Sequence, residues 1–240
     1  MHVFGVNRRA AEMFRAMLAG RCEFVSFGDV LRNTVPENEM IKWFMFEFFL
    51  CDEPSRVECL QHFLRTRPAS EMVNDVIRIE HEFTTLLISS MQHSHQCNAT
   101  RMLLDAGCDV NQCNGHGETA LHLAVALQCL PCTELICAHM CKIQADMNTA
   151  TNNGTTALHI AVKYGSSEIT ELLLHSQADP NATDDNLQNC LHYMARYPNE
   201  DVRSILLAAV DESTWKATDY WGHTPSQHSV RLLAFYDYMN

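Results

Sequence analysis

A seven-residue stretch, residues 156–162, strongly limits what this chain can fold into, because near copies of it return at regular intervals. It reads T-A-L-H-I-A-V, while T-A-L-H-L-A-V stands at residues 119–125 and N-C-L-H-Y-M-A at residues 189–195. Degenerate copies begin at Thr85 and Thr224. The starting positions 85, 119, 156, 189 and 224 are 34, 37, 33 and 35 residues apart. A period of this length indicates a stack of repeating units.

Each unit has the pattern of two short helices followed by a turn. Thr156 can cap free backbone N–H groups with its hydroxyl, and a helix that begins there fits as far as Gly165. Residues 169–173 carry apolar side chains at spacings of three and four, which predicts a second helix with one buried face. A-D-P-N at residues 178–181 is typical of a turn. Neither helix can bury its apolar face alone, so the unit must stack on its copies.

The recurring Leu-His pair, with Leu-Leu and Ala-Asp-x-Asn at fixed offsets, resembles the ankyrin repeat family, whose signature is T-P-L-H-x-A. The resemblance is strongest over residues 119–181 and extends from residue 85 to residue 240. It implies an all-α fold, in which an ankyrin-repeat solenoid follows a helical N-terminal region. We expect an ankyrin repeat domain of about four to five repeats over residues 84–240, with degenerate terminal repeats.

Residues 1–83 show no repeat signature but carry several helical patterns. The apolar residues 40–51 and the helical pattern of residues 55–65 have the layout of an ankyrin unit, and residues 70–82 form a further helical pattern. They are either decayed repeats or a separate helical cap. We expect helical pairs that stack on the repeats, because so large an apolar face would aggregate if exposed. Three aromatic residues are expected to cover the opposite end of the stack: Phe235, Tyr236 and Tyr238.

Composition narrows the class of partner and the compartment. The 240 residues include 17 basic and 29 acidic ones, for a net charge of −12, which argues against direct nucleic-acid binding and favours a basic protein segment; the acidity alternatively serves solubility. The longest apolar run, residues 44–50, is far shorter than the roughly 20 residues that span a membrane. The 11 cysteines lack the spacing of a disulfide scaffold, and the start lacks a signal-peptide pattern. We therefore expect a cytoplasmic and/or nuclear protein with reduced thiols.

Three regularly spaced histidines could suggest a metal site: His122, His159 and His192. They lie one repeat apart, too far to meet on one ion at about 2 Å from each. The resemblance implies instead that each His forms hydrogen bonds with the loop and with the Thr that opens its motif. We expect a structural role, with no metal and no cofactor.

Four cysteines form a sharper metal candidate: Cys129, Cys132, Cys137 and Cys141. Cys137 and Cys141 are four residues apart and share a helical face, and Cys132 could reach them from the preceding loop. The spacing matches no known zinc pattern, and free cysteine also packs as a small buried hydrophobe. Zinc binding, a redox pair and core packing are the alternatives, of which we favour core packing.

No catalytic motif is present: there is no G-x-S-x-G, no phosphate loop with Lys and no H-E-x-x-H. Asp184 and Asp185 are expected to be solvated in a loop tip rather than catalytic. We therefore predict a non-enzymatic module that binds a protein partner.

The resemblance also implies where a partner binds, because loop tips and the exposed turns of first helices line a concave groove in ankyrin stacks. From the loop tips the expected residues are Gly115, His116, Glu118, Asn152, Asn153, Thr155, Asp185, Asn186, Gln188, Tyr220, Trp221 and His223, and from the first helices Ala126, Leu127, Lys163, Tyr164, Arg196 and Tyr197. Tyr and Trp are enriched among interface hot spots, so we expect a Lys or Arg near an apolar anchor to lie over Tyr164, Tyr197 and Trp221. The alternative is that each ring lies flat on a neighbouring repeat.

Two narrower resemblances suggest roles. The long second repeat and W-G-H-T-P at residues 221–225 are similar to inhibitors of Rel/NF-kappa-B factors, which are acidic stacks with a lengthened middle repeat. E-F-T-T-L-L at residues 82–87, leading to L-L-D-A-G at residues 103–107, is similar to Fem-type substrate receptors of cullin ubiquitin ligases. A scaffold that joins two partners is the third alternative.

Overall fold

A computed structural model describes residues 77–79, 82–92 and 97–228 of the chain. The chain divides into two compact units, residues 1–109 and 110–240. The helices expected before residue 77 and the aromatic residues expected to cover the stack, Phe235, Tyr236 and Tyr238, lie outside the described residues. In the described part, helices dominate and confirm the all-α repeat architecture. No helix in this part is long and apolar enough to cross a membrane.

A short strand pair in the first unit corrects one expectation. Strands β1 (Ile77–Ile79) and β2 (Glu82–Thr84) pair antiparallel, with Ile77 opposite Thr84. The helical pattern expected over residues 70–82 is therefore wrong at these positions. Isoleucines that alternate along the chain favour an extended backbone, and the second strand provides the hydrogen-bonding partner that a helix would otherwise supply internally.

The first unit continues with a helix pair, α6 (Leu86–Gln92) and α7 (Cys97–Asp105). Leu87, Ile88 and Leu103 are buried there, as the predicted apolar faces require. Gly107 follows α7 with a φ of 87°, a left-handed conformation that glycine adopts without steric cost and that ends the helix.

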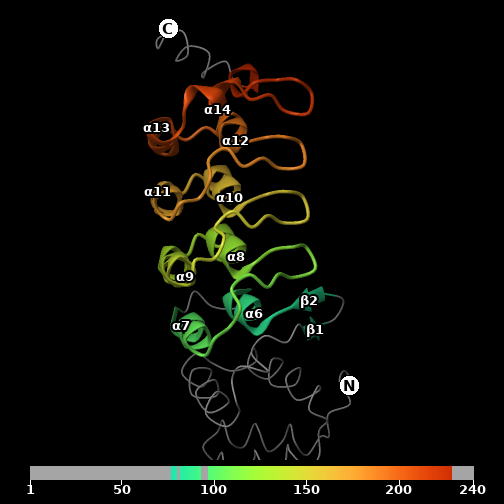
Figure 1. Cartoon of the computed structure of the whole chain (residues 1–240), viewed down its shortest axis with the longest axis vertical. Coiled ribbons are helices and arrows are strands. Elements are labelled where there is room, and N and C mark those ends of the chain that lie inside the picture. The colour runs from blue at the N-terminus through green and yellow to red at the C-terminus, as the bar shows by residue number, and fades with distance from the viewer. Residues whose placement is uncertain (1–76, 80–81, 93–96, 229–240) are drawn as a thin grey trace, which may run out of the picture. The chain divides into compact units, whose positions relative to one another are not determined.

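The second unit repeats this helix pair along the chain. Its elements are α8 (Ala120–Ala126), α9 (Leu130–Ile143), α10 (Ala157–Tyr164), α11 (Ser167–His175), α12 (Cys190–Arg196), α13 (Glu200–Ala209), α14 (Glu212–Lys216) and the short 3-10 helix η1 (Pro225–His228). Within this unit α8, α10 and α12 form one column and α9, α11 and α13 a second, and each repeat sends a loop to the same side (Figure 1). The repeats therefore stack in sequence order, as predicted.

The core of the second unit comes from the repeated motif. Leu121, Leu158 and Leu191 are at most 2% exposed, which confirms the prediction that they are core residues. Ala124 and Ala161 are fully buried, and their small side chains let neighbouring helices approach closely. The buried faces of adjacent repeats thereby stabilise one another.

Candidate partner-binding surface

Each repeat of the second unit presents a loop tip built to the same plan. The tips are residues 114–118, 151–155, 184–188 and 219–223, and in each the first backbone N–H donates to the carbonyl oxygen of the last residue, at 2.9–3.0 Å. The side chain of the first residue adds further bonds. Asp219 Oδ1 accepts the backbone N–H groups of Trp221 and His223, and Asn114 Oδ1 does the same in its own tip. The tips are therefore rigid turns that hold their outer side chains in fixed directions.

The structure corrects the expectation that Asp184 is solvated. Its side chain is buried, with Oδ1 accepting the backbone N–H groups of Asn186 and Gln188 and Oδ2 accepting the hydroxyl of Tyr193. Tyr193 lies on α12, so this contact depends on how the repeat folds and not on the tip sequence alone. Asp185 is exposed, as expected.

Backbone hydrogen bonds join each tip to the next. Asn152 donates to the carbonyl oxygen of His116 at 3.0 Å, and Asp185 donates to that of Asn153 at 3.1 Å. Tyr220 donates to the carbonyl oxygen of Asn186 at 2.8 Å. The tips of four successive repeats consequently form one continuous edge.

Most of the predicted partner-binding side chains are exposed. The exposed ones are His116, Asn152, Asn153, Lys163, Tyr164, Asp185, Asn186, Arg196, Tyr197, Tyr220, Trp221 and His223, together with Gly115 and Leu127. Glu118 is half-buried, and its Oε2 accepts a hydrogen bond from the Asn114 side chain, while Ala126 and Thr155 are also half-buried. Gln188 is only 3% exposed, so the expectation that it lines the surface is wrong. The Gln188 backbone N–H donates to Asp184 Oδ1, and its carbonyl oxygen lies 3.1 Å from His159 Nε2. These two bonds orient the Gln188 side chain inward.

Three apolar side chains occupy the same position of consecutive repeats. Leu127, Tyr164 and Tyr197 each lie eight residues after the start of their motif, at the end of the first helix. They are 38%, 50% and 39% exposed. Burial against a neighbouring repeat, the alternative considered from the sequence, therefore leaves a large part of each side chain free. Lys163 Nζ lies 5.8 Å from the centre of the Tyr164 ring, so a cation of the chain itself already faces this ring.

Leu187 is a candidate that the sequence reasoning missed. It is 50% exposed and has a φ of 59°, at the tip position that Gly117, Gly154 and Gly222 occupy in the other repeats. A bulky residue in this left-handed conformation is an outlier that costs free energy. The signal was present in the sequence, because Leu stands where the aligned tips have Gly.

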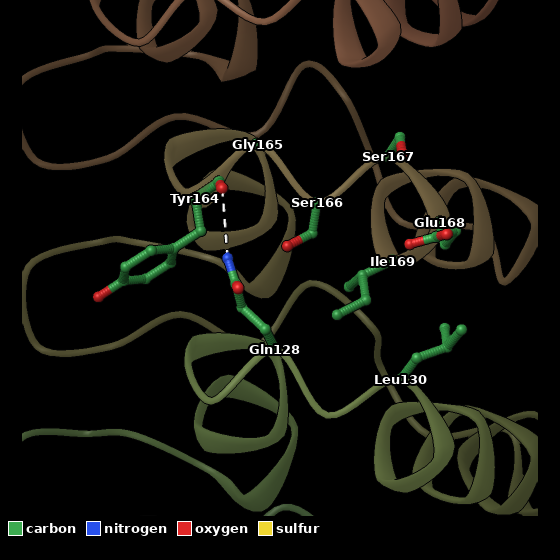
Figure 2. A pocket seen from close by; sticks show the side chains of 8 residues that line it. All are labelled: Gln128, Leu130, Tyr164, Gly165, Ser166, Ser167, Glu168 and Ile169. Carbon is green, nitrogen blue, oxygen red and sulfur yellow. Dashed lines mark hydrogen bonds between the residues drawn. The ribbon is translucent and has the colours of Figure 1, made fainter.

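A cavity of about 300 Å³ lies beside Tyr164, between the α8–α9 and α10–α11 connections. It is lined by Gln128, Leu130, Tyr164, Gly165, Ser166, Ser167, Glu168 and Ile169. Figure 2 shows Gln128 reaching up from the lower repeat to donate to the Tyr164 carbonyl oxygen, while the Tyr164 ring points away from Ser167 and Glu168. This volume is at the small end of the range for ligand pockets, and it leaves room for one inserted side chain.

The cysteines agree with the core-packing interpretation. Cys129, Cys132 and Cys137 are buried and Cys141 is exposed. Burial raises the pKa of Cys137 to about 11, which leaves its thiol protonated and unreactive near neutral pH. In the part of the chain that the structure describes, no three of these four sulfur atoms lie within 4.8 Å of one another.

The stacked helix pairs and the continuous edge of loop tips define a helical repeat protein. A sequence model described as ankyrin repeats (3 copies) matches residues 51–184 and 137–219, which is more than half of the chain. The chain therefore belongs to the ankyrin repeat family. A search of curated proteins finds no match. Ankyrin repeats are generally protein-interaction modules and are typically non-enzymatic.

Proposed function

We propose that this chain binds a protein segment without catalysing a reaction, across the surface formed by the loop tips and the ends of the first helices. This surface corresponds to the groove expected from the family resemblance. The observation that supports it is the regular exposure of Leu127, Tyr164 and Tyr197 in three consecutive repeats. Side chains of this kind at equal steps suit an extended partner that crosses several repeats, and large aromatic anchors supply most of the affinity of such interfaces.

The loop tips add further apolar anchors. Tyr220 is 72% exposed and Trp221 is 59% exposed, with ring centres 5.8 Å apart in an edge-to-face arrangement. Because Tyr220 also donates a backbone hydrogen bond to Asn186, this pair is held against the tip of residues 184–188, where Leu187 is exposed. Exposed aromatic groups on a rigid turn lose little conformational entropy on binding, which favours their use as contacts.

The partner segment is proposed to be basic. The net charge of −12 steers a basic ligand inward at low salt. An aromatic face adds on the order of 0.5–2 kcal/mol for a well-placed cation. Since Lys163 already faces the Tyr164 ring, we assign this contact to Tyr197 and Trp221 and leave Tyr164 as an apolar contact. The cavity beside Tyr164, with the Glu168 carboxylate on its wall, would accept a partner's Lys side chain.

Two finer roles follow from the narrower resemblances. A regulator of Rel transcription factors is supported by the length of α9, which has 14 residues against 9 in α11 and 10 in α13. A Fem-type substrate receptor rests on the sequence of residues 82–87 and 103–107, which spans β2 and the α6–α7 pair. In either role we propose that the protein acts in the cytoplasm or nucleus.

Quantitative affinity capture tests the proposed surface. The wild type is compared with Tyr197→Ala combined with Trp221→Ala, and with Ile143→Ala as a control, because Ile143 is similarly exposed, at 49%, but lies at the end of a second helix. We expect specific proteins to be retained by the wild type and the control, lost by the double variant, and weakened by salt. Rel proteins among them would support the first finer role, and a cullin with its adaptor the second.

Equal recovery by all three proteins, at low and at high salt, would contradict the proposal. Residues 1–83 would then become the region in which to look for the binding site. The melting temperature of each variant is measured first, so that loss of partner is separated from loss of fold.

A further inference from the structure

Three side chains of the fifth repeat bring potential metal ligands together. Asp219 begins the tip of residues 219–223, His223 ends it, and His228 is the last residue of η1. One ligand atom of each lies within 4.8 Å of the others. We infer that these three residues bind a divalent transition metal ion, with Zn²⁺ the best-suited candidate. Aspartate oxygen and histidine nitrogen are both ordinary zinc ligands, at about 2.0–2.2 Å from the ion.

The Asp219 carboxylate is already held in place for this role. Its Oδ1 accepts the backbone N–H groups of Trp221 at 3.0 Å and His223 at 2.8 Å, while Oδ2 faces His228 Nε2 at 2.9 Å and Gln188 Nε2 at 3.5 Å. These contacts fix the orientation of the Asp219 carboxylate before an ion binds.

The two histidines approach the carboxylate from different sides. The rings of His223 and His228 are 5.5 Å apart and nearly perpendicular, and His223 Nδ1 lies 3.8 Å from Asp219 Oδ1. Ligand atoms of a tetrahedral zinc site are about 3.3 Å apart when the bonds are about 2 Å long. A small rotation of His223, whose side chain is 55% exposed, would close the remaining distance. His228 would lose the proton that it shares with Asp219 through Nε2 and bind the ion with that nitrogen.

A neighbouring histidine, His192, already forms contacts through both of its ring nitrogens. His192 lies 5.6 Å from His228 between ring centres, but its Nδ1 contacts Asn189 and its Nε2 donates to the His223 carbonyl oxygen at 3.1 Å. Among the described residues the site therefore has three protein ligands, and water or a group of a partner would complete the coordination. None of the three other tips has histidine as its last residue, since Glu118, Thr155 and Gln188 stand there. The arrangement is thus not a feature of the common tip plan.

An ion bound here would join the tip of residues 219–223 to η1. Tyr220 and Trp221 lie between Asp219 and His223 in sequence, so the ion would hold both aromatic residues of the tip in one arrangement. This consequence does not depend on whether these aromatic residues bind a partner. A ligand that binds only the folded state also raises the melting temperature.

Metal titration of the full chain under reducing conditions tests the inference. Zn²⁺ binding is measured by calorimetry, and Co²⁺ is used as a spectroscopic substitute, since cobalt bound to thiolate gives a strong near-ultraviolet band that cobalt bound to nitrogen and oxygen lacks. The variants are His223→Asn and His228→Gln, with His116→Asn as a matched control, because His116 is also an exposed tip histidine but lies beside Asn114 instead of an aspartate. We expect both site variants to bind Zn²⁺ at least about tenfold more weakly than the wild type and the control.

The expected Co²⁺ spectrum of the site lacks the thiolate band and disappears in both site variants. Three results would overturn the inference: no Zn²⁺ binding by the wild type, equal binding by the wild type and His223→Asn, or a thiolate band that accounts for all bound cobalt. If His228→Gln fails to fold, His223→Asn decides the outcome alone, because its exposed side chain makes little contribution to the core.

Discussion

His159 ties its own repeat to the next one: its Nε2 lies 3.1 Å from the carbonyl oxygen of Gln188, the residue directly before the following motif. Its Nδ1 lies 2.9 Å from the Thr156 hydroxyl and 3.1 Å from the Thr156 backbone nitrogen. Because Nδ1 accepts the backbone N–H, the ring proton belongs on Nε2, which donates to Gln188. His122 reaches Thr155, and His192 reaches His223, in the same way. The expected structural role of these histidines is confirmed, and it extends across repeats.

Acidification is predicted to destabilise the stack through these histidines. Burial is the main cause that lowers the pKa of His122, His159 and His192 below the ordinary value of 6.5. Between the lowered pKa and 6.5 the unfolded chain binds more protons, so the free energy of unfolding falls as the pH falls through this range. Chemical denaturation from about pH 7.5 to about pH 5.5 measures the effect, and an unchanged midpoint would refute it.

A glutamine variant isolates the contribution of one histidine. In the fifth repeat, Gln227 takes the motif position and its Oε1 accepts the Thr224 backbone N–H at 2.8 Å. His159→Gln should therefore keep the local bond, lose the titrating group, and show a weaker pH dependence than the wild type. The lowered pKa values of Asp211 and Asp219, each about 2, place their own losses of stability at lower pH, outside this window.

Leu158→Ala should destabilise the centre of the stack. The side chain is 2% exposed, and removing a buried leucine costs about 2–5 kcal/mol through lost burial and the cavity left behind. Ile143→Ala is the control, since surface substitutions usually change the free energy of unfolding by less than about 0.5 kcal/mol. Urea denaturation that gives both variants the same midpoint would contradict the core assignment.

Gly154→Ala should be more harmful than Gly222→Ala. Both glycines have positive φ, 75° and 80°, so each substitution incurs the left-handed cost of about 1–2 kcal/mol. A Cβ at Gly154 would also lie 2.6 Å from the Asp185 backbone nitrogen, whereas one at Gly222 would meet nothing within 4 Å. The difference in unfolding free energy between the two variants measures how tightly the tips of residues 151–155 and 184–188 are packed. Equal losses would mean that the tips separate easily.

Leu187→Gly should raise stability, in contrast to Leu187→Ala. Glycine removes the strain of the left-handed backbone, which costs about 1–2 kcal/mol. Its greater flexibility in the unfolded chain offsets about 0.5–1 kcal/mol of this gain in stability. Alanine keeps the strain. Thermal melts of both variants and of the wild type test whether glycine raises the melting temperature and alanine does not. If partner affinity also falls in both variants, Leu187 is a partner contact that is retained at a cost in stability. A glycine variant no more stable than the alanine variant would show that Leu187 is not strained.

The sequence by itself determined the repeat, because the ankyrin motif is local. Thr156, Leu158 and His159 lie within four residues, and capping, core packing and the bond from Nδ1 to Thr156 all follow from their spacing along one helix start. The exposed position of Tyr164 and Tyr197 follows from the same frame, since a residue at a fixed offset recurs on the same side of every unit.

Tertiary structure alone decided which side chains of the tips are exposed to solvent. Asp184 and Asp185 are adjacent and chemically alike, yet Asp184 is buried, where it accepts hydrogen bonds from its own tip and from the Tyr193 hydroxyl, and Asp185 is exposed. Strands β1 and β2 likewise formed because each provides hydrogen bonds that the other lacks. Asp219 and His228 are nine residues apart, and η1 brings the imidazole to 2.9 Å from the carboxylate. Contacts of this kind depend on where the backbone turns, and helical periodicity carries no information about that distance.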